Sequence, residues 1–242
     1  MISVCIATFN GEKFIKEQLY SIAKQLGDSD EIIISDDCST DKTIEYINAL
    51  NDKRIKVFTN TKGKVKRTFD HATHNFENAL MNTKGDIIFL SDQDDVWLDN
   101  RIEHNINLLK VNDLVITDCK VVDSSLNVIE ESYFTLLNSG PGIFKNILKN
   151  SYLGCCMAFN KNILSYILPF PKYLVPHDIW IGLNVELRGK VYFSNASTLL
   201  YRRHGNNLSA TSGKSSNSLI FKLTYRLAII YNLIKRYFQK SL

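Results

Sequence analysis

Short apolar runs alternate with helix-patterned segments through the first half of the chain, and this alternation constrains the fold more than any other feature. The apolar runs are residues 2–8, 31–35, 55–58, 86–90 and 115–117. Between them, apolar residues recur at the three- and four-residue spacing of an amphipathic helix, as in residues 12–26 and 99–109. Continuous apolar strands that alternate with helices indicate an α/β fold, with a mostly parallel central sheet and helices on both faces.

The second half of the chain has a less regular pattern. Strands are predicted over residues 153–159 and 198–203, and helices over 160–168, 177–188 and 219–238. We expect one α/β domain in two halves, followed by a linker and a C-terminal helix. The predicted boundaries are 1–115 for the first half, 116–212 for the second half, and 213–242 for the linker and helix.

Bulk properties exclude several classes of protein. The net charge is only +4, which does not favour nucleic acid as a partner. Five cysteines without regular spacing indicate free thiols in a reducing compartment, and not a disulfide framework. The apolar N-terminus has no positive region or cleavage site, and the chain has no run of about 18 apolar residues. These features predict a cytoplasmic protein.

Polar clusters follow three of the predicted strands. They are Thr8-Phe9-Asn10, Asp36-Asp37 and Asp92-Gln93-Asp94-Asp95. Ligands of open α/β sheets bind beyond the carboxyl ends of the strands. We therefore expect the three clusters to converge on one ligand site.

The acidic cluster after residues 86–90 is the strongest candidate for a metal site. Three carboxylates within four residues repel one another unless a cation lies among them, and carboxylate oxygens suit Mg²⁺ or Mn²⁺. The alternative is a solvated acidic turn with a helix cap at Asp94, Asp95 or Asp99.

The other two clusters permit a nucleotide interpretation. A carboxylate at Asp36 or Asp37 could accept hydrogen bonds from a base or a ribose, whereas Ser39 or Asp41 could cap the next helix. Gly11, after the first strand, would let the backbone come close to a ligand, and the alternative is a plain strand-to-helix turn.

Three stretches together resemble a known family. They are ISVCIATFNGEKFI, IIISDDCSTDKTI and GDIIFLSDQDDVWL. In this order they are similar to family 2 glycosyltransferases, which have a GT-A fold. The SDQDDVW form resembles bacterial rhamnosyltransferases and related enzymes of polysaccharide assembly. The resemblance is dense over residues 1–112 and thinner as far as 210.

The resemblance implies a nucleoside-diphosphate sugar, UDP- or dTDP-linked, as donor, and a glycan or lipid-linked oligosaccharide as acceptor. The implied nucleotide-binding residues are Thr8, Asn10, Asp37, Arg67 and Asp92. The implied ligands of Mg²⁺ or Mn²⁺ are Asp94, Asp92 and His204.

The sequence departs from the family pattern at two places. Cys38 occupies a position where Gly or Asn is usual. A basic insert between Gly63 and Asn75 leaves open whether Lys64, Lys66 or Arg67 faces the nucleotide.

Asp178 opens the predicted helix at 177–188 and matches the family's general base, which takes the proton of the acceptor hydroxyl. The alternative is an Asp that complements the helix dipole. A base acting in a single displacement implies an inverting enzyme. We also expect donor or acceptor contacts from Trp97, His177 and Arg203, with the arginines after residue 201 neutralising phosphate charge.

Residues 219–242 form a basic amphipathic pattern. Such a helix can lie on the anionic inner face of the cell membrane, or it can dock on the domain or on a partner. The sequence argues against two other functions. A nucleotidyltransferase would need a Gly-rich basic signature near the N-terminus, which ATFNGEKF does not provide. A non-catalytic sugar-nucleotide-binding or membrane-scaffold module would have no need of Asp92, Asp94 and Asp178.

Overall fold

The computed structural model describes residues 1–61, 68–171, 175–204 and 218–239, with only the backbone described at 68–70. The described strands form one sheet in the order β3-β2-β1-β4-β8-β6-β9-β5, and β7 pairs with β6. The strands are β1 (Ile2–Thr8), β2 (Glu31–Asp36), β3 (Ile55–Thr59), β4 (Ile87–Asp92), β5 (Val96–Trp97), β6 (Leu114–Val122), β7 (Val128–Glu130), β8 (Met157–Asn160) and β9 (Val191–Arg202).

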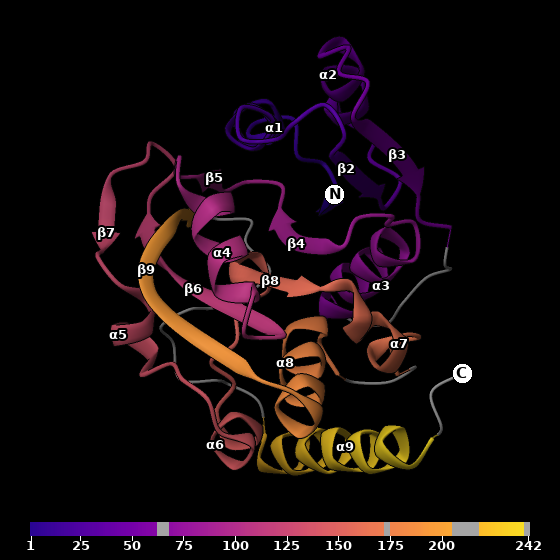
Figure 1. Cartoon of the computed structure of the whole chain (residues 1–242), viewed down its shortest axis with the longest axis vertical. Coiled ribbons are helices and arrows are strands. Elements are labelled where there is room, and N and C mark those ends of the chain that lie inside the picture. Colours follow the sequence, from indigo (N-terminus) through magenta and orange to yellow (C-terminus); the bar gives the residue numbers. More distant parts are fainter. Residues whose placement is uncertain (62–67, 172–174, 205–217, 240–242) are drawn as a thin grey trace.

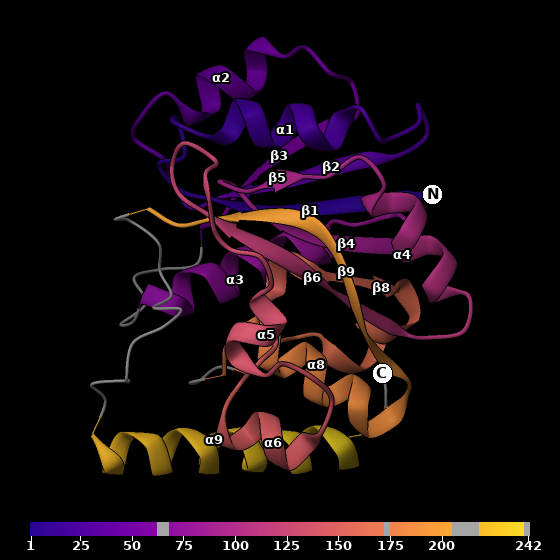
Figure 2. The same ribbon diagram turned by 90° about the vertical axis from the view of Figure 1, so that its left-hand side faces the viewer.

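Helices cover both faces of this sheet (Figures 1 and 2). The α-helices are α1 (Ile15–Ala23), α2 (Thr43–Ala49), α3 (Thr68–Met81), α4 (Arg101–Leu109), α5 (Tyr133–Leu137), α6 (Ile143–Leu148), α7 (Leu164–Ile167), α8 (His177–Arg188) and α9 (Leu219–Phe238). Two short 3₁₀ turns are η1 (Gly154–Cys156) and η2 (Lys161–Ile163). Among the described residues, no helix is long and apolar enough to cross a membrane.

The sheet is parallel in its first half and mixed in its second half. Strands β3, β2, β1 and β4 pair in parallel, as predicted. Strand β8 is antiparallel to both β4 and β6, and β5 is antiparallel to β9. Strands β6 and β9 again pair in parallel, so the predicted α/β sheet is interrupted mainly by β8, which runs against both of its neighbours.

The layers of helices follow the chain order. Helices α1 and α2 lie on one side of the sheet, while α3 packs on β1 and β2 from the other side and α8 packs on α3 (Figure 2). Helices α6 and α9 lie at the base of the molecule, beyond α8. One hydrophobic core runs through both halves, and the predicted boundary at residue 115 falls inside β6.

Candidate active site

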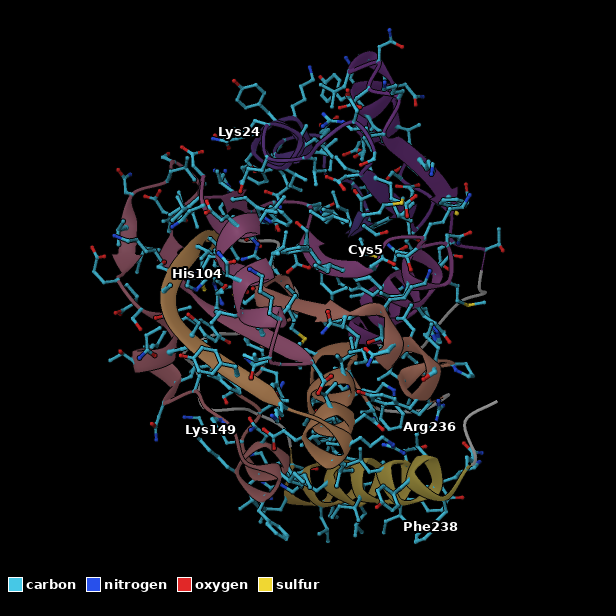
Figure 3. The ribbon with its side chains drawn as sticks, in the orientation of Figure 1. Cys5, Lys24, His104, Lys149, Arg236 and Phe238 are labelled. Atoms are coloured by element: carbon cyan, nitrogen blue, oxygen red, sulfur yellow. The ribbon has the colours of Figure 1, made fainter. Side chains whose placement is uncertain are left out.

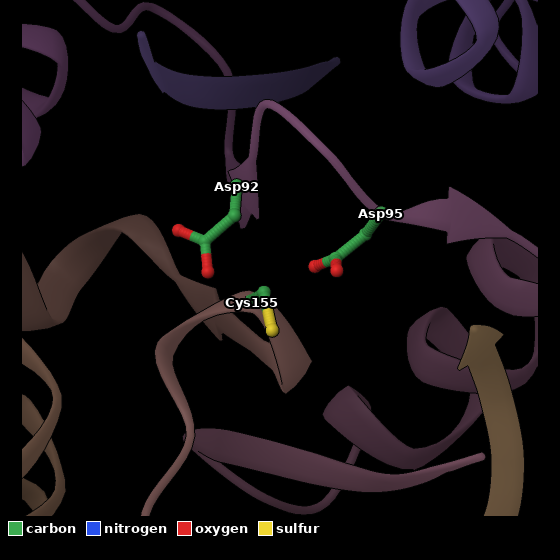
Figure 4. Close-up of side chains that lie close together, drawn as sticks. All are labelled: Asp92, Asp95 and Cys155. Atoms are coloured by element: carbon green, nitrogen blue, oxygen red, sulfur yellow. The ribbon is translucent and has the colours of Figure 1, made fainter. Parts of the chain in front are cut away.

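The acidic loop after β4 folds back so that two of its carboxylates face each other. Asp92 ends β4 and Asp95 directly precedes β5. Their carboxylate oxygens and the sulfur of Cys155 lie within 4.8 Å of one another (Figure 4). Asp95 is fully buried, and its Oδ1 accepts a hydrogen bond of 3.0 Å from the backbone N–H of Arg202. Its Oδ2 has no hydrogen-bond partner among the described residues, an arrangement that a cation would satisfy.

The carboxyl groups of this loop oppose one another's ionisation. Burial, together with the charges of Asp94 and Asp178, raises the pKa of Asp92 to about 7. Burial and the two neighbouring aspartates raise the pKa of Asp95 well above its ordinary value. Burial also raises the pKa of Asp94, although a hydrogen bond with His204 opposes the shift. The residues present therefore fit a divalent cation, whose charge would offset theirs.

Asp94 and His204 are brought together from distant parts of the sequence. Nε2 of His204 lies 2.8 Å from Oδ2 of Asp94, and the imidazole ring stacks on Phe14 with 4.9 Å between centroids. The charge of Asp94 acts on Asp92 in turn. Carboxylate oxygens with one imidazole nitrogen form a donor set that Mn²⁺ accepts. Among the described residues, however, the ligand atoms within 4.8 Å of one another belong to Asp92, Asp95 and Cys155, and metal binding by Asp92, Asp94 and His204 together stays a prediction.

Arg202 is a buried clamp on the acidic loop. Its guanidinium donates to the backbone oxygens of Asp94 at 2.7 Å and Ser124 at 2.8 Å, forms an ion pair with Glu17, and lies 4.6 Å from the ring centroid of Phe14. The expectation that both arginines neutralise phosphate charge is wrong for Arg202, because its guanidinium is buried and committed to protein groups.

Trp97 lies in the hydrophobic core and not on a ligand surface. Its side chain is 1% exposed, packs on Phe89 with 5.4 Å between ring centroids, and lies 4.7 Å from the guanidinium of Arg101. The predicted donor or acceptor contact of Trp97 is therefore wrong, because the ring faces inward. Arg203 is half-buried and donates its backbone N–H to Val122, and its predicted contact stays a prediction.

Asp37 stands at the carboxyl end of β2 with two side-chain partners. It accepts a 3.0 Å hydrogen bond from Asn60, and its Oδ2 lies 2.8 Å from Nδ1 of His71 on α3. Asp36 points elsewhere: it is buried and accepts from the backbone N–H and the hydroxyl of Ser39. Asp37 is thus the more accessible of the two carboxylates, and its expected contact with the nucleotide base stays a prediction.

The turn after β1 is held by a glutamine from the acidic loop. Gln93 accepts from the hydroxyl of Thr8 at 2.5 Å and from the backbone of Phe9 at 2.9 Å, and it donates to the carbonyl of Phe9 at 3.0 Å. A Cβ at Gly11 would lie 2.4 Å from this side chain. The absence of a side chain at Gly11 therefore leaves room for the Gln93 side chain. The hydroxyl of the buried Thr8 fixes the acidic loop through its hydrogen bond to Gln93.

Asn10 and Cys38 both have left-handed backbone conformations, with φ of 48° and 62°. The side-chain oxygen of Asn10 accepts from the backbone N–H of Thr40, so Asn10 ties the turn after β1 to the loop after β2. The φ of Cys38 explains why Gly or Asn suits this position. Arg67, Lys64 and Lys66 lie outside the described residues.

Asp178 stands at the start of α8. It lies in the first turn of α8, where its Oδ2 accepts a 3.0 Å hydrogen bond from Asn150. Its charge contributes to the raised pKa of Asp92 and also to that of Tyr133. Asp178 is therefore close enough to Asp92 for its charge to act on that carboxyl, although the two residues are far apart in sequence, and its role as the base stays a prediction.

His177 packs beside this site. Its ring lies 4.2 Å from the ring of Phe76, and burial lowers its pKa, so the imidazole is neutral at pH 7. A Cβ at Gly154 would lie 2.4 Å from Nε2 of His177, so only glycine lets η1 and α8 approach this closely. The predicted sugar contact of His177 stays a prediction.

Nothing in the sequence pattern pointed to His71 or Cys155. Asp95 and Gln93 belong to the acidic cluster that the sequence singles out, although the family resemblance gives neither of them a role. Cys155 reaches the loop only because β8 pairs with β4.

Comparisons with known proteins agree with this geometry. The family model described as "Glycosyl transferase family 2" matches residues 3–168. The chain is 29% identical over 220 residues to the Escherichia coli UDP-Glc:alpha-D-GlcNAc-diphosphoundecaprenol beta-1,3-glucosyltransferase WfaP, covering 88% of this chain and 82% of WfaP. It is 26% identical to the Shigella flexneri dTDP-rhamnosyl transferase RfbG, covering 94% and 79% of the two chains.

Solved structures share the fold. S. aureus TarS in complex with UDP-GlcNAc superposes with a TM-score of 0.66 at 21% identity, covering 99% of this chain and 73% of that chain. Glucosyl-3-phosphoglycerate synthase from Mycobacterium tuberculosis, in complex with Mn²⁺, UDP and its product, superposes with a TM-score of 0.59 at 18% identity, covering 98% and 78%. These neighbours establish a GT-A fold for the chain. With a family match over most of its length, the chain belongs to the family 2 glycosyltransferases and is a glycosyltransferase.

Proposed function

We propose that this enzyme is an inverting glycosyltransferase of cell-surface polysaccharide biosynthesis. It transfers a sugar from a UDP- or dTDP-linked donor to a hydroxyl of a glycan or lipid-linked acceptor. The observation that carries the proposal is the packing of His177, at the start of α8, against Gly154 of η1, since the next residue, Cys155, lies with Asp92 and Asp95 in the acidic cluster. Residues 1–115 would bind the donor, and residues 116–212 would bind the acceptor.

Asp92, Asp94 and His204 would hold Mg²⁺ or Mn²⁺ at the donor diphosphate. When bound, the cation offsets the negative charge that grows on the departing diphosphate. The buried Asp95, whose carboxylate accepts a hydrogen bond from the backbone N–H of Arg202, would add negative charge beside this site. Asp37 would accept from the base of the nucleotide, with His71 and Asn60 orienting its carboxylate.

Asp178 would act as the general base. The acceptor oxygen forms a bond to the anomeric carbon while its proton passes to the Asp178 carboxylate. The bond from the anomeric carbon to the phosphate oxygen breaks, and the nucleoside diphosphate leaves with the electron pair. Asn150 holds the carboxylate in place through its 3.0 Å hydrogen bond. One displacement of this kind inverts the anomeric centre.

The donor sugar is proposed only by class. Relatives carry names that specify UDP-glucose and dTDP-rhamnose, so a hexose or a 6-deoxyhexose such as rhamnose suits the proposal. Attachment to the inner face of the cell membrane would bring a lipid-linked acceptor to the site.

A panel of nucleoside diphosphates tests the donor site. UDP, dTDP, GDP and ADP are added to the protein with and without Mn²⁺, and the melting temperature is measured. We expect stabilisation by UDP or dTDP that requires Mn²⁺ and is lost in Asp94→Ala. A folded protein that responds to none of the four would argue for the non-catalytic alternative.

A further inference from the structure

Helix α9 has one broad apolar face, and the domain covers only part of it. Ile229 and Leu233 are buried against the domain. The large apolar side chains that remain exposed on α9 are Leu219, Ile220, Leu223, Leu227, Ile230, Tyr231, Ile234, Tyr237 and Phe238. At 3.6 residues per turn these nine positions fall within an arc of about 120° that adjoins the buried residues on one side and faces away from the domain. Figure 3 shows Phe238 on the outer side of α9 and Arg236 on the side of the domain.

The inner face fixes α9 firmly in place. Arg236 donates to the backbone oxygen of Leu168 at 2.7 Å, and Arg188 of α8 donates to the backbone oxygen of Arg236 at 2.9 Å. Arg226 donates to the backbone oxygen of Leu148 on α6 at 2.8 Å. Because these contacts fix the inner side of α9 against the domain, the outer apolar side chains face solvent. Packing in the protein's own core therefore does not explain why they are apolar.

Helix α6 extends the exposed apolar surface. Phe144 is 84% exposed and Leu148 is 63% exposed, and α6 contacts α9 at the base of the molecule (Figure 2). We call the exposed apolar residues of α9, with Phe144 and Leu148, the basal surface.

The C-terminal part of the chain, residues 132–242, is strongly basic. Residues 132–242 contain 14 Lys and Arg but only two acidic residues, Asp178 and Glu186. Lys145, Lys149 and Lys235 belong to the helices that form the basal surface or directly follow them. An apolar surface bordered by these exposed lysines is complementary to anionic lipid headgroups over an apolar interior.

We propose that the basal surface docks on an anionic lipid bilayer, with α6 and α9 lying in the plane of the headgroups. A second copy of the chain is a poorer occupant, because a symmetric contact would bring the lysines of one copy close to the lysines of the other. This surface is larger than a single amphipathic helix, since it adds Phe144 and Leu148 of α6 to α9.

The docked surface lies next to the proposed base. Helix α8 contacts α6 and α9 and begins at His177, so Asp178 stands in its first turn. Tyr225 of α9 packs on the core, and the charge of Asp178 contributes to its raised pKa. Resting on the proposed function, this arrangement assigns the acceptor to the class of lipid-linked molecules that present a hydroxyl at the membrane surface.

Vesicle co-sedimentation tests the proposal with the full chain. Vesicles of phosphatidylcholine with about one third phosphatidylglycerol are compared with vesicles of phosphatidylcholine alone. We expect binding to the anionic vesicles that weakens at high salt. The double variant Leu223→Ser/Leu227→Ser should lower the partition coefficient by about tenfold or more, and Phe144→Ser should lower it by a smaller factor.

The control is Tyr20→Ser, which removes a side chain of 72% exposure from α1 on the opposite side of the molecule. It should bind vesicles as the unmodified chain does. The proposal would be overturned if the double variant bound the anionic vesicles as well as the unmodified chain does, or if the folded, unmodified chain did not bind them. A dimer in light scattering that the double variant abolishes would also overturn it, in favour of a second copy. Nucleoside-diphosphate binding is measured on every variant, so a failure of docking and a failure of the donor site are told apart.

Discussion

The Nε2 atom of His204 lies 2.8 Å from the Oδ2 atom of Asp94, which joins the end of β9 to the acidic loop after β4. Through this contact the segment just after β9 reaches the acidic loop. It places an imidazole nitrogen beside carboxylates whose pKa values burial has raised.

Loss of the His204 imidazole should weaken metal binding. His204→Ala is expected to raise the Mn²⁺ concentration needed for nucleotide-dependent stabilisation by about 10- to 100-fold. The measurement is the melting temperature across a Mn²⁺ titration at saturating nucleotide. His104→Ala is the matched control, because His104 bonds to Ser194 on another part of the sheet. An equal response of the two variants would remove His204 from the metal site.

Metal binding should strengthen as pH rises. A pKa of about 7 for Asp92 means that the folded, metal-free protein holds a proton that the unfolded chain releases near its ordinary carboxyl pKa. The folded state binds more protons between these values, so metal-free stability should fall as pH rises from about 4 to 7. A cation displaces the proton, so Mn²⁺ affinity should be lower at pH 6 than at pH 8, by up to about tenfold per pH unit below the pKa.

Thermal unfolding in EDTA and in Mn²⁺ at several pH values measures both effects. Asp92→Asn removes the titrating carboxyl, and it should flatten the metal-free pH dependence. The assignment to Asp92 would be contradicted if the metal-free stability of the unmodified chain rose from pH 5 to pH 7 while that of Asp92→Asn did not.

Gly11→Ala should displace Gln93 from its three hydrogen bonds. The added Cβ would lie 2.4 Å from the side-chain oxygen of Gln93, so the amide must move. We expect a loss of about 1–3 kcal/mol in the free energy of unfolding, and weaker nucleotide binding. In Gly11→Ala/Gln93→Ala the two losses should not add, because both changes remove the same bonds. Gly27→Ala is the control, since its nearest contact would be an ordinary 3.5 Å.

Cys38→Gly should stabilise the protein. Cys38 has a φ of 62°, a conformation that costs a residue with a Cβ about 1–2 kcal/mol. The greater freedom of glycine in the unfolded chain offsets part of the gain, which leaves a rise of about 1–3 °C in melting temperature. A melting temperature that falls by several degrees in calorimetry would show that contacts of the thiol outweigh the backbone strain.

The sequence predicted the elements with strong periodicity and missed the short ones. The predicted bounds of α8 and α9 match the structure, because each carries a long helical pattern with a clear start. Strand β5 has two residues and β7 has three, too few for a pattern to emerge. Strand β9 begins at Val191, before the predicted 198, since polar residues in its first part conceal it.

Within the site, local patterns identified Asp92, Asp94 and Asp178, but they could not tell which side chains face inward. Trp97 follows the acidic loop closely in sequence, yet the short strand β5 turns its ring into the core. Cys155 and His71 reach the site through strand pairing and helix packing, which no local spacing encodes. The sequence shows one broad apolar face on α9, but it does not show that the domain covers only the part with Ile229 and Leu233.

A transfer assay with labelled donors and a lipid-linked acceptor tests the central claim most directly. The unmodified chain and Asp178→Asn are compared, and the anomeric configuration of the product is read by NMR. We predict an inverted product from a UDP- or dTDP-linked sugar, and a fall in kcat of about 10²- to 10⁴-fold in Asp178→Asn with nucleotide binding unchanged. A product of retained configuration, or undiminished turnover by Asp178→Asn, would contradict the account.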